Sequence, residues 1–335
     1  MIRRRSLLQG AFAAGVLATA GARAQDPWPT RPVRLVVGLA PGGIADLTAR
    51  IIAPRLGEVL GQNVLVENRT GAGGAIATKM VAASPADGST LLVAFDGTHV
   101  TIPAANPSIG FDPLTEFAPI AKVVDSPVLI TAHPGFPAHD FGEFIELSRR
   151  SIGAGSGPRV YDYGTAGVGS TGHLTMELLK LRLGFFAVHI PYRGGGEARA
   201  QVMGRQIPLM LAAVPTTSGD IRAGVLKGLA VTSAKRSPAL PNVPALAELG
   251  YAETKDLDVN SWVGLVAPAK TPSAVVSRLD AALRQVMATE DVSKRLLDSG
   301  SMPVKSSPEI FARQIAADYA QWKKVIAESR LRLDA

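Results

Sequence analysis

Two hydrophobic periods alternate along the chain and predict strands and helices in turn. Short β-branched runs, such as residues 33–39 and 90–95, are typical of buried strands, whereas apolar residues at spacings of three and four are typical of helices. We expect strands at 33–39, 64–67, 90–95, 128–131, 160–163, 187–191, 208–211, 229–232 and 262–267, and helices at 47–60, 75–83, 141–149, 174–183 and 198–203. This alternation predicts an α/β protein with open, mostly parallel sheets covered by helices.

Two amphipathic helices are expected to close the chain. The last one has Ser307 as a candidate N-cap and Pro308 in its first turn. Its apolar stripe comprises Phe311, Ile315, Tyr319, Trp322 and Ile326. Aromatic residues at helical spacing usually belong to a core rather than to a cofactor site, so we interpret this stripe as core.

The strand–helix rhythm stops after the third strand and restarts near Ala121, which indicates two lobes. A proline-rich stretch at 237–244 has the character of a crossover, after which the chain returns to the first lobe. A chain of 335 residues also exceeds what one hydrophobic core usually serves. We therefore expect residues 25–124 and 251–335 to form one lobe and residues 125–250 the other, with a hinge and a ligand cleft between them.

The first 24 residues have the composition of an export signal. Arginines at 3–5 precede an apolar stretch that is too short to span a bilayer, and Ala22-Arg23-Ala24 supplies the small-x-small pattern of a cleavage site. Residues 4–9 also resemble a twin-arginine signal, although ordinary secretory signals carry paired arginines too. We expect an exported protein whose mature chain begins at Gln25.

The remaining composition argues against several classes of function. Four of the 35 basic residues and none of the 28 acidic residues fall in the leader, so the formal charge drops from +7 to +3 (31 basic minus 28 acidic). The basic residues form no runs and are not interleaved with aromatics, which argues against nucleic-acid binding. The chain has no cysteine, which excludes disulfides, thiol chemistry and cysteine-based zinc sites.

Two glycine-rich turns, each between a predicted strand and a predicted helix, are the main candidates for chemistry. Residues 40–46 contain Gly42 and Gly43, and residues 164–173 contain Gly167 and Gly169. Glycines let the backbone approach a ligand closely, and free amides at the start of a helix favour an anion without any lysine or arginine. One such turn in each lobe suits a carboxylate, although glycines at these junctions also occur for steric reasons alone. Three polar residues are candidate ligand contacts and equally candidate helix caps, namely Asp46, Ser170 and Thr171.

The second turn also matches the dinucleotide-binding fingerprint Gly-x-Gly-x-x-Gly, at Gly167, Gly169 and Gly172. The next strand ends at Tyr192-Arg193 without the acidic residue that would hold a ribose, although an arginine there favours a 2′-phosphate. An exported NADP-dependent oxidoreductase is therefore our second hypothesis, ranked behind ligand capture because no catalytic Lys/Tyr/His set stands nearby. Ser170 lacks the leading glycine of a nucleophile elbow, and the five histidines show no metal-ligand spacing.

Longer ordered motifs resemble one family of binding proteins over essentially the whole mature chain. They occur at 28–34 (Trp-Pro-Thr-Arg-Pro-Val-Arg), 40–43 with Asp46, 66–69, 71–74, 87–88, 97–99, 167–174, 189–192, 229–238 and 262–268. In these residues the chain is similar to the periplasmic substrate-binding proteins of tripartite tricarboxylate transporters, the Bug or TctC-type family.

The resemblance implies a type II periplasmic-binding fold, with two doubly wound α/β lobes, a two-strand hinge and a ligand cleft between the lobes. It also implies a carboxylate held by backbone amides and ordered waters. Carried over onto this chain, the site falls on Gly42, Gly43, Asp46, Gly97, Thr98, Thr165, Gly167, Gly169, Ser170, Thr171 and His173.

Two residues depart from the family pattern. Ile44 stands where many members have a third glycine, which narrows the first turn and reduces direct amide contact. Ala212 stands where many members carry an aspartate that reads the far end of an amino acid or a similar ligand. We count Ala212 among the ligand-binding residues, and its lack of charge disfavours an amino-bearing ligand.

The motifs and the resemblance together predict a monomeric periplasmic receptor that captures a small carboxylate-bearing solute for uptake by a two-component membrane permease. We expect no enzymatic activity, no cofactor, no metal and no nucleic-acid partner. Three alternatives stay open: the NADP-dependent enzyme, a ligand-sensing co-receptor without a transport role, and a receptor for aromatic or amide ligands.

Overall fold

The structure, a computed structural model, describes residues 28–153 and 161–329, and the expected leader at 1–24 lies outside these ranges. Within them one sheet has the strand order β2-β1-β3-β9-β4-β7-β5-β6, and β8 and β10 also pair with β4. The strands are β1 (Val33–Val37), β2 (Val64–Asn68), β3 (Thr90–Phe95), β4 (Phe117–Ala132), β5 (Tyr161–Thr165), β6 (Ala187–Pro191), β7 (Leu209–Ala213), β8 (Lys227–Val231), β9 (Asn260–Pro268) and β10 (Met302–Pro303). The α-helices are α2 (Ile44–Leu60), α3 (Ala75–Ala82), α4 (Ile102–Ala105), α5 (Phe141–Gly153), α6 (Thr171–Leu183), α7 (Gly195–Met203), α8 (Ser218–Arg222), α9 (Ser273–Met287), α10 (Glu290–Ser299) and α11 (Pro308–Ser329).

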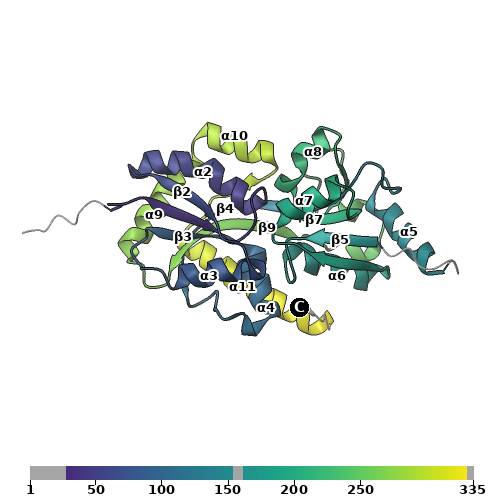
Figure 1. Ribbon diagram of the computed structural model, residues 1–335, viewed down its shortest axis with the longest axis horizontal. Helices are drawn as coiled ribbons and strands as arrows, with labels where there is room; N and C mark the ends of the chain where they lie inside the picture. Colours follow the sequence, from purple (N-terminus) through teal and green to yellow (C-terminus); the bar gives the residue numbers. More distant parts are fainter. Residues whose placement is uncertain (1–27, 154–160, 330–335) are drawn as a thin grey trace, which may run out of the picture.

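The first half of the sheet carries helices on both faces (Figure 1). β1 pairs in parallel with β2 and with β3, in the strand–helix–strand order that the sequence predicts. Helices α2, α9 and α10 cover one face, where Leu35 and Ile52 are buried. Helices α3 and α11 cover the other face, where Val36 and Phe311 are buried. We call this group of elements the first lobe.

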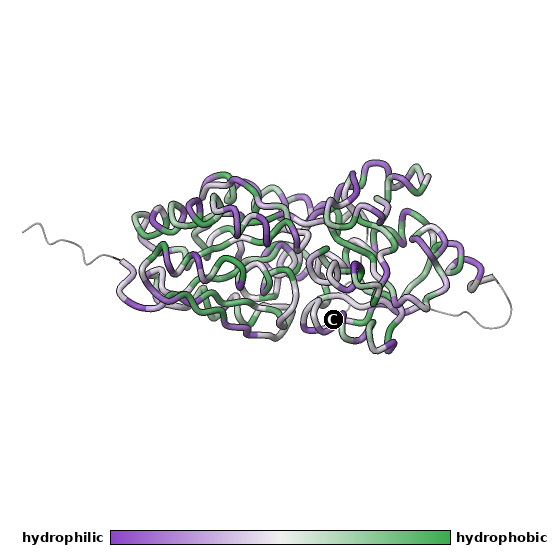
Figure 2. Tube along the Cα trace, turned by 90° about the horizontal axis from the view of Figure 1, so that it is seen from above, coloured by the Kyte–Doolittle hydropathy of each residue, from purple (hydrophilic) through white to green (hydrophobic). Residues whose placement is uncertain are grey.

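The second half of the sheet repeats this arrangement. β5 pairs in parallel with β6 and with β7. Phe144 of α5 and Leu179 of α6 pack in the core on one face, and Val202 of α7 packs with Met210 on the other. We call this group the second lobe, and Figure 2 shows the two lobes side by side. Each lobe is an α/β sheet with helices on both faces, which confirms the predicted fold class.

Two antiparallel strands connect the lobes. β4 passes from the first lobe into the second, because its residues 117–127 pair with β9 and its residues 128–132 pair with β7 and β8. The predicted strand at 128–131 was therefore too short, and the sheet is antiparallel through its centre rather than mostly parallel. Two register shifts interrupt the β4–β9 ladder, and Pro119 and Pro127 lie within it. Bulges and prolines of this kind break the alternation that marks a strand in a sequence.

Three helices, not the predicted two, close the chain. α10 is a short helix between α9 and α11, and only its Val292 and Leu296 are buried, so it shows little apolar stripe. The last helix agrees with the prediction, because the Ile310 amide donates to Ser307 Oγ (3.3 Å) and Phe311 is fully buried. None of the helices within the two described ranges combines the length and apolar composition needed to cross a membrane.

We predict that Gly264→Ala destabilises the first lobe, because Gly264 lies in β9 beneath α11. A Cβ at this position would overlap the ring of Phe311 and would stand 2.8 Å from the carbonyl oxygen of Ala121. Overpacking of this kind costs about 1–3 kcal/mol, which thermal unfolding should show as a lowered Tm. Gly219→Ala is the matched control, because no atom lies within 4 Å of the added carbon. Equal Tm values for the two variants would contradict the prediction.

Candidate functional site

A small cavity lies between the two lobes, where the turns after β1, β5 and β6 face one another. Its volume is about 20 Å³, room for roughly one water molecule. The lining residues come from both lobes and from the connecting strands β4 and β9, and none of them carries a charge. They are Leu39, Gly43, Ile44, Phe95, Val128, Ala166, Ser170, Gly172, Gly195, Leu211, Ala212, Ala213, Thr216 and Ser261. We call this space the inner cavity.

The first predicted turn brings the start of α2 to the inner cavity. Gly43 is the N-cap residue, and having no side chain it leaves the first amides of the helix uncapped. Asp46 faces away from the cavity, because its carboxylate accepts hydrogen bonds from the Gly42 amide, Arg50 Nε and Asn68 Nδ2, each at 3.0 Å. Burial by itself raises the pKa of Asp46, but these hydrogen bonds outweigh it and hold the pKa below its usual value. Asp46 therefore shapes the turn and lies outside the cavity lining.

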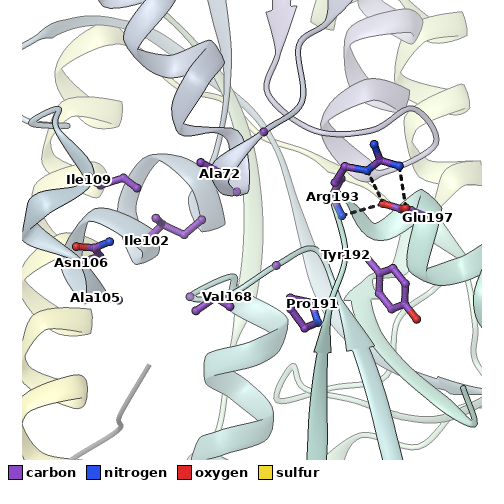
Figure 3. A pocket seen from close by; sticks show the side chains of 14 residues that line it. Ala72, Ile102, Ala105, Asn106, Ile109, Val168, Pro191, Tyr192, Arg193 and Glu197 are labelled. Carbon is purple, nitrogen blue, oxygen red and sulfur yellow. Dashed lines mark hydrogen bonds and ion pairs between the residues drawn. The ribbon is translucent and has the colours of Figure 1, made fainter. Parts of the chain in front are cut away.

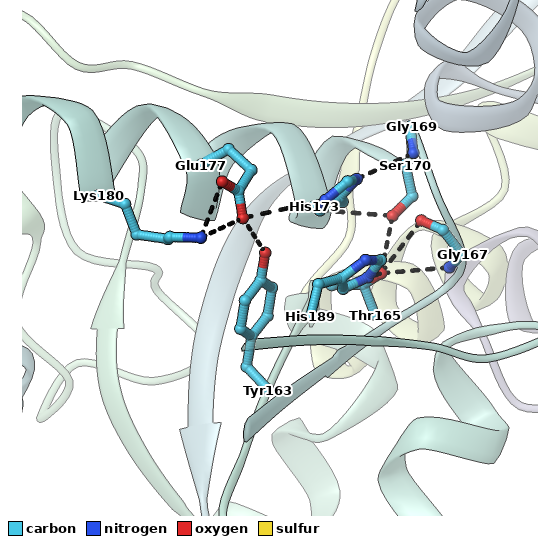
Figure 4. Close-up of polar contacts among 9 residues, drawn as sticks. All are labelled: Tyr163, Thr165, Gly167, Gly169, Ser170, His173, Glu177, Lys180 and His189. Atoms are coloured by element: carbon cyan, nitrogen blue, oxygen red, sulfur yellow. Dashed lines mark hydrogen bonds and ion pairs between the residues drawn. The ribbon is translucent and has the colours of Figure 1, made fainter. Parts of the chain in front are cut away.

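The second predicted turn is held by hydrogen bonds inside its own lobe (Figure 4). Thr165 Oγ1 accepts from the Gly167 amide (3.2 Å) and from Ser170 Oγ (3.2 Å). The Gly169 amide donates to His173 Nδ1 (3.0 Å), and Ser170 Oγ caps α6 by accepting from the His173 amide (3.4 Å). The amides of Gly167 and Gly169 are thus already engaged, and of these five residues only Ser170 lines the inner cavity.

Two stacked histidines hold this turn in place through hydrogen bonds. The rings of His173 and His189 lie 3.8 Å apart and nearly parallel, and His189 Nε2 is 2.6 Å from Thr165 Oγ1. Burial lowers the pKa of His173 to about 4 and that of His189 to about 3, so both rings are neutral at pH 7. Because Nδ1 of His173 accepts a hydrogen bond from the Gly169 amide, the ring proton of the neutral imidazole is on Nε2, which lies 3.9 Å from Glu177 Oε1. His173 positions the turn rather than facing the cavity.

A third glycine turn, which sequence reasoning missed, completes the site. Gly194 is the N-cap of α7 and provides no side-chain cap, and Gly195 lines the inner cavity. The Gly195 nitrogen stands 3.9 Å from the place that a Cβ on Gly43 would occupy. Two uncapped helix starts, one from each lobe, therefore meet at the same point. Three successive glycines between a strand and a helix were the signal that could have nominated this turn.

The remaining predicted residues are spread around the cavity. Ala212 lines it, as the sequence predicts. Gly97 and Thr98 begin a short π-helix (Gly97–Thr101) after β3, where Thr98 Oγ1 donates to the Phe95 carbonyl (3.2 Å) and its methyl packs against Gly74. Neither belongs to the cavity lining. Two hydroxyl residues that the sequence did not nominate do line it, Thr216 and Ser261.

The lobes touch through hydrogen bonds that cross from one to the other. Thr171, a predicted ligand contact, is used in this way, because its hydroxyl donates to the buried carboxylate of Asp96 after β3. At the glycine turns the crossing bonds are Thr171 Oγ1 to Asp96 Oδ2, Thr101 Oγ1 to the Gly169 carbonyl (2.6 Å), and the Ala40 amide to the Arg193 carbonyl (3.1 Å). A further bond joins α8 to α10, where Ser218 Oγ donates to the Ser299 carbonyl (2.8 Å). The turns therefore form part of the contact between the lobes as well as the cavity wall.

Asp96 is a buried acid at the contact between the lobes. It is 3 % exposed, and besides Thr171 it accepts a hydrogen bond from the Trp262 amide (3.3 Å). Burial raises the pKa of Asp96 to about 7, and the neighbouring carboxylate of Asp318 acts in the same direction. The hydrogen bonds from Thr171 and Trp262 only partly offset this rise. Asp96 therefore titrates close to neutral pH at the contact between the lobes.

The dinucleotide-like fingerprint has a packing explanation. A Cβ on Gly172 would stand 2.8 Å from the Leu211 carbonyl oxygen, so glycine is required for α6 to lie against β7. Gly167 and Gly169 have φ values of +126° and +75°, which favour glycine at a turn. All three glycines are accounted for by backbone geometry, without a bound pyrophosphate.

A larger cavity, of about 710 Å³, lies on the other side of the second turn (Figure 3). Ala72, Ile102 and Val168 contribute to its mostly apolar wall. Its charged residues, Arg193 and Glu197, bind each other (3.2 Å). Gly167 and Gly169 line this cavity, and so does Glu197 in the first turn of α7. Gly43, Ser170 and Ala212 line the inner cavity instead. Because only the inner cavity joins the start of α2 to the start of α7, we place the candidate anion site there despite its smaller volume.

The chain is similar to one family of receptors over most of its length. The family described as "Tripartite tricarboxylate transporter family receptor" matches residues 48–331. Protein BugT of Bordetella pertussis is 32% identical over 95% of this chain and 96% of its own length.

Solved structures of similar proteins include two with bound acids. The structure of R. palustris Rpa4515 with adipate is 33% identical, with a TM-score of 0.84 over 90% of this chain and 98% of its own. MatC from Rhodopseudomonas palustris with bound malate is 30% identical, with a TM-score of 0.81 over 89% of this chain and 100% of its own.

We predict that Gly196→Ala prevents the lobes from touching while leaving both folded. A Cβ on Gly196 would overlap the Pro41 carbonyl of the opposite lobe and stand 3.4 Å from the Gly42 carbonyl carbon. Within α7 itself, alanine stabilises a helix relative to glycine by roughly 1 kcal/mol. Small-angle X-ray scattering should show a larger radius of gyration than for the wild type, at a Tm no lower than that of the wild type. Gly219→Ala is again the control, and a Gly196→Ala scattering curve identical to it would refute the expectation.

We also predict that Asp96→Asn changes how stability depends on pH. The folded chain keeps the Asp96 proton up to about pH 7, whereas the unfolded chain releases it near 3.8. This group's contribution to stability is therefore complete below pH 3.8 and is lost as pH rises through 7. Asparagine does not titrate, so the Tm of the variant relative to the wild type should increase from pH 5 to pH 8. Parallel Tm profiles over this range would show that Asp96 does not titrate there.

Proposed function

The chain belongs to the tripartite tricarboxylate transporter receptor family, and from this we propose that it captures a small organic acid in the inner cavity. The acid's carboxylate binds between the start of α2 at Gly43 and the start of α7 at Gly195. The solute is then passed to a membrane permease. Support comes from the family, whose members are receptors, and from the adipate and malate seen in two relatives.

The observation that carries this proposal is the meeting of two uncapped helix starts in a cavity without charged side chains. Each helix start bears a partial positive charge of roughly half a unit, and its free amides are hydrogen-bond donors. α2 has 17 residues and α7 has 9, so both are full helices. An anion between them gains from both dipoles at once, and the surrounding low dielectric strengthens this attraction.

The size of the inner cavity requires the lobes to move. A space of about 20 Å³ holds about one water molecule and no organic acid. We propose that the lobes separate and close about β4 and β9, the two strands that join them. We place the lobes at residues 25–124 with 251–335 and at residues 125–250. Leu257 packs in the core of the second lobe, which favours a return crossing a few residues after 250.

The location and assembly of the protein follow from the same proposal. We propose a monomer in the periplasm, exported by the leader at 1–24, with no catalytic activity. A receptor that reports its ligand to a sensor would share this capture step, so the cavity is common to transport and signalling. The backbone geometry and packing of Gly167, Gly169 and Gly172 explain the fingerprint without requiring a nucleotide.

The test is ligand-induced stabilisation of the mature chain, with Gly43→Val as the diagnostic variant. Valine fits the extended backbone of Gly43 (φ −83°, ψ 170°) but fills the space beside the Gly195 nitrogen. Thermal-shift measurements should cover dicarboxylates, monocarboxylates, amino acids, amides and NADP. An acid present at 100 times its Kd should add about 2.7 kcal/mol of stability to the wild type and almost none to Gly43→Val.

Gly219→Val is the control, because residue 219 borders open space in α8 and should leave the ligand response intact. Stabilisation by NADP with no response to any acid would overturn the proposal. An acid response that survives unchanged in Gly43→Val would show that the acid does not bind in the inner cavity.

A further inference from the structure

We propose that the inner cavity selects acids with a single negative charge and an uncharged body that carries a hydroxyl or oxo group. In this assignment Thr216 and Ser261 bind that polar substituent. The inference rests on the proposed function, since it concerns the ligand class of the same site. Three features of the cavity support the inference: one position for an anion, apolar walls elsewhere, and two hydroxyls that make no hydrogen bond within the described residues.

The two helix starts form one anion position rather than two. The Gly195 nitrogen is 3.9 Å from the place of a Cβ on Gly43, so one carboxylate placed there meets both helices. The third helix that starts at the cavity, α6, is already capped, because Ser170 accepts a hydrogen bond from the His173 amide. The described residues around the cavity therefore offer uncapped helix amides at a single point.

The other walls do not suit a second carboxylate. They are formed by apolar side chains such as Ile44, Phe95 and Leu211, and no lysine, arginine or histidine belongs to the lining. Asp96 follows directly after Phe95 and is buried, so its negative charge above neutral pH opposes a second anion nearby. An ionised group buried without a partner is strongly unfavourable. A dicarboxylate therefore has one end that this cavity cannot satisfy.

Thr216 and Ser261 are polar groups that need a partner. Thr216 follows β7 in the turn Val214–Thr216 and is 6 % exposed, and Ser261 lies in β9 and is 1 % exposed. Both line the inner cavity, and Thr216 Oγ1 stands 3.6 Å from the place of a Cβ on Gly195. Neither hydroxyl makes a hydrogen bond within residues 28–153 and 161–329, and neither oxygen is among the fully buried unpartnered ones of those residues. Both oxygens are therefore accessible from the cavity and free to bond a ligand substituent.

The two hydroxyls reach the inner cavity from different elements. Thr216 approaches from the second lobe beside Gly195, and Ser261 approaches along a strand that connects the lobes. Because Thr216 stands beside the anion position, we assign to the pair a substituent close to the ligand's carboxylate. Each hydroxyl can donate or accept a hydrogen bond, which suits a hydroxyl or an oxo group on that carbon.

The charge test uses isothermal titration calorimetry of the mature wild-type chain with matched pairs of acids. The pairs are 2-hydroxybutyrate with malate, butyrate with succinate, and hexanoate with adipate. In each pair a second carboxylate is the main change. We expect the monocarboxylate to bind at least 100-fold more tightly than its dicarboxylate partner, with 2-hydroxybutyrate the tightest of the four four-carbon acids.

The hydroxyl test uses Thr216→Val and Ser261→Ala. Each variant should lower the affinity for 2-hydroxybutyrate about tenfold more than it lowers the affinity for butyrate. A merely structural role would lower both affinities equally. Thr98→Val is the matched control, because Thr98 is a buried threonine that bonds its own lobe outside the cavity, and it should keep the full preference.

The outcomes separate this inference from the function on which it rests. Dicarboxylates that bind as tightly as their monocarboxylate partners, or a hydroxyl preference that survives in both variants, would overturn the inference and leave acid capture in place. Binding of none of the six acids, together with no response to any acid in the thermal-shift panel, would overturn acid capture itself.

Discussion

Close approach of backbone to backbone between the lobes is the constraint on which the site depends. Helices α2 and α7 direct their first amides to one point only because glycine stands at each junction. A Cβ on Gly194 would lie 2.8 Å from the Ala40 nitrogen, and a Cβ on Gly196 would overlap the Pro41 carbonyl. Glycine thus performs two tasks that any other residue would prevent. It lets the lobes touch, and it leaves the helix starts uncapped for an anion.

The charged residues around this point are arranged so that they do not compete with the helix dipoles. Asp46 is bonded to Arg50 and Asn68 within its own lobe. His173 and His189 are neutral at pH 7 because burial lowers their pKa values. Backbone dipoles act strongly in such buried surroundings, because a low dielectric screens them less than bulk water does. They also lose no side-chain entropy on binding, unlike a lysine or an arginine.

The two connecting strands explain how a large sheet serves two lobes. β4 belongs to both cores, with Val124 packed in the first and Val128 in the second. The lobes are therefore linked by continuous backbone hydrogen bonding through β4 and β9, and they meet elsewhere through a few hydrogen bonds at the turns and between α8 and α10. These crossing bonds involve small side chains and backbone, so the contact between lobes is compatible with the opening that ligand entry requires.

Local sequence determined the strand–helix alternation, the core faces and the first two glycine turns, because periodicity and glycine placement reflect forces within a few residues. It did not reveal the length of β4, whose prolines and register shifts hide a strand that only partner strands complete. It also left Asp46 and Thr171 ambiguous between cap and ligand contact. Only tertiary structure decided that Asp46 fixes its own turn, that Thr171 bridges to Asp96, and that Thr216 and Ser261 meet Gly195 at one cavity. These partners lie far apart in the chain, and residue type alone does not encode which distant groups will be neighbours.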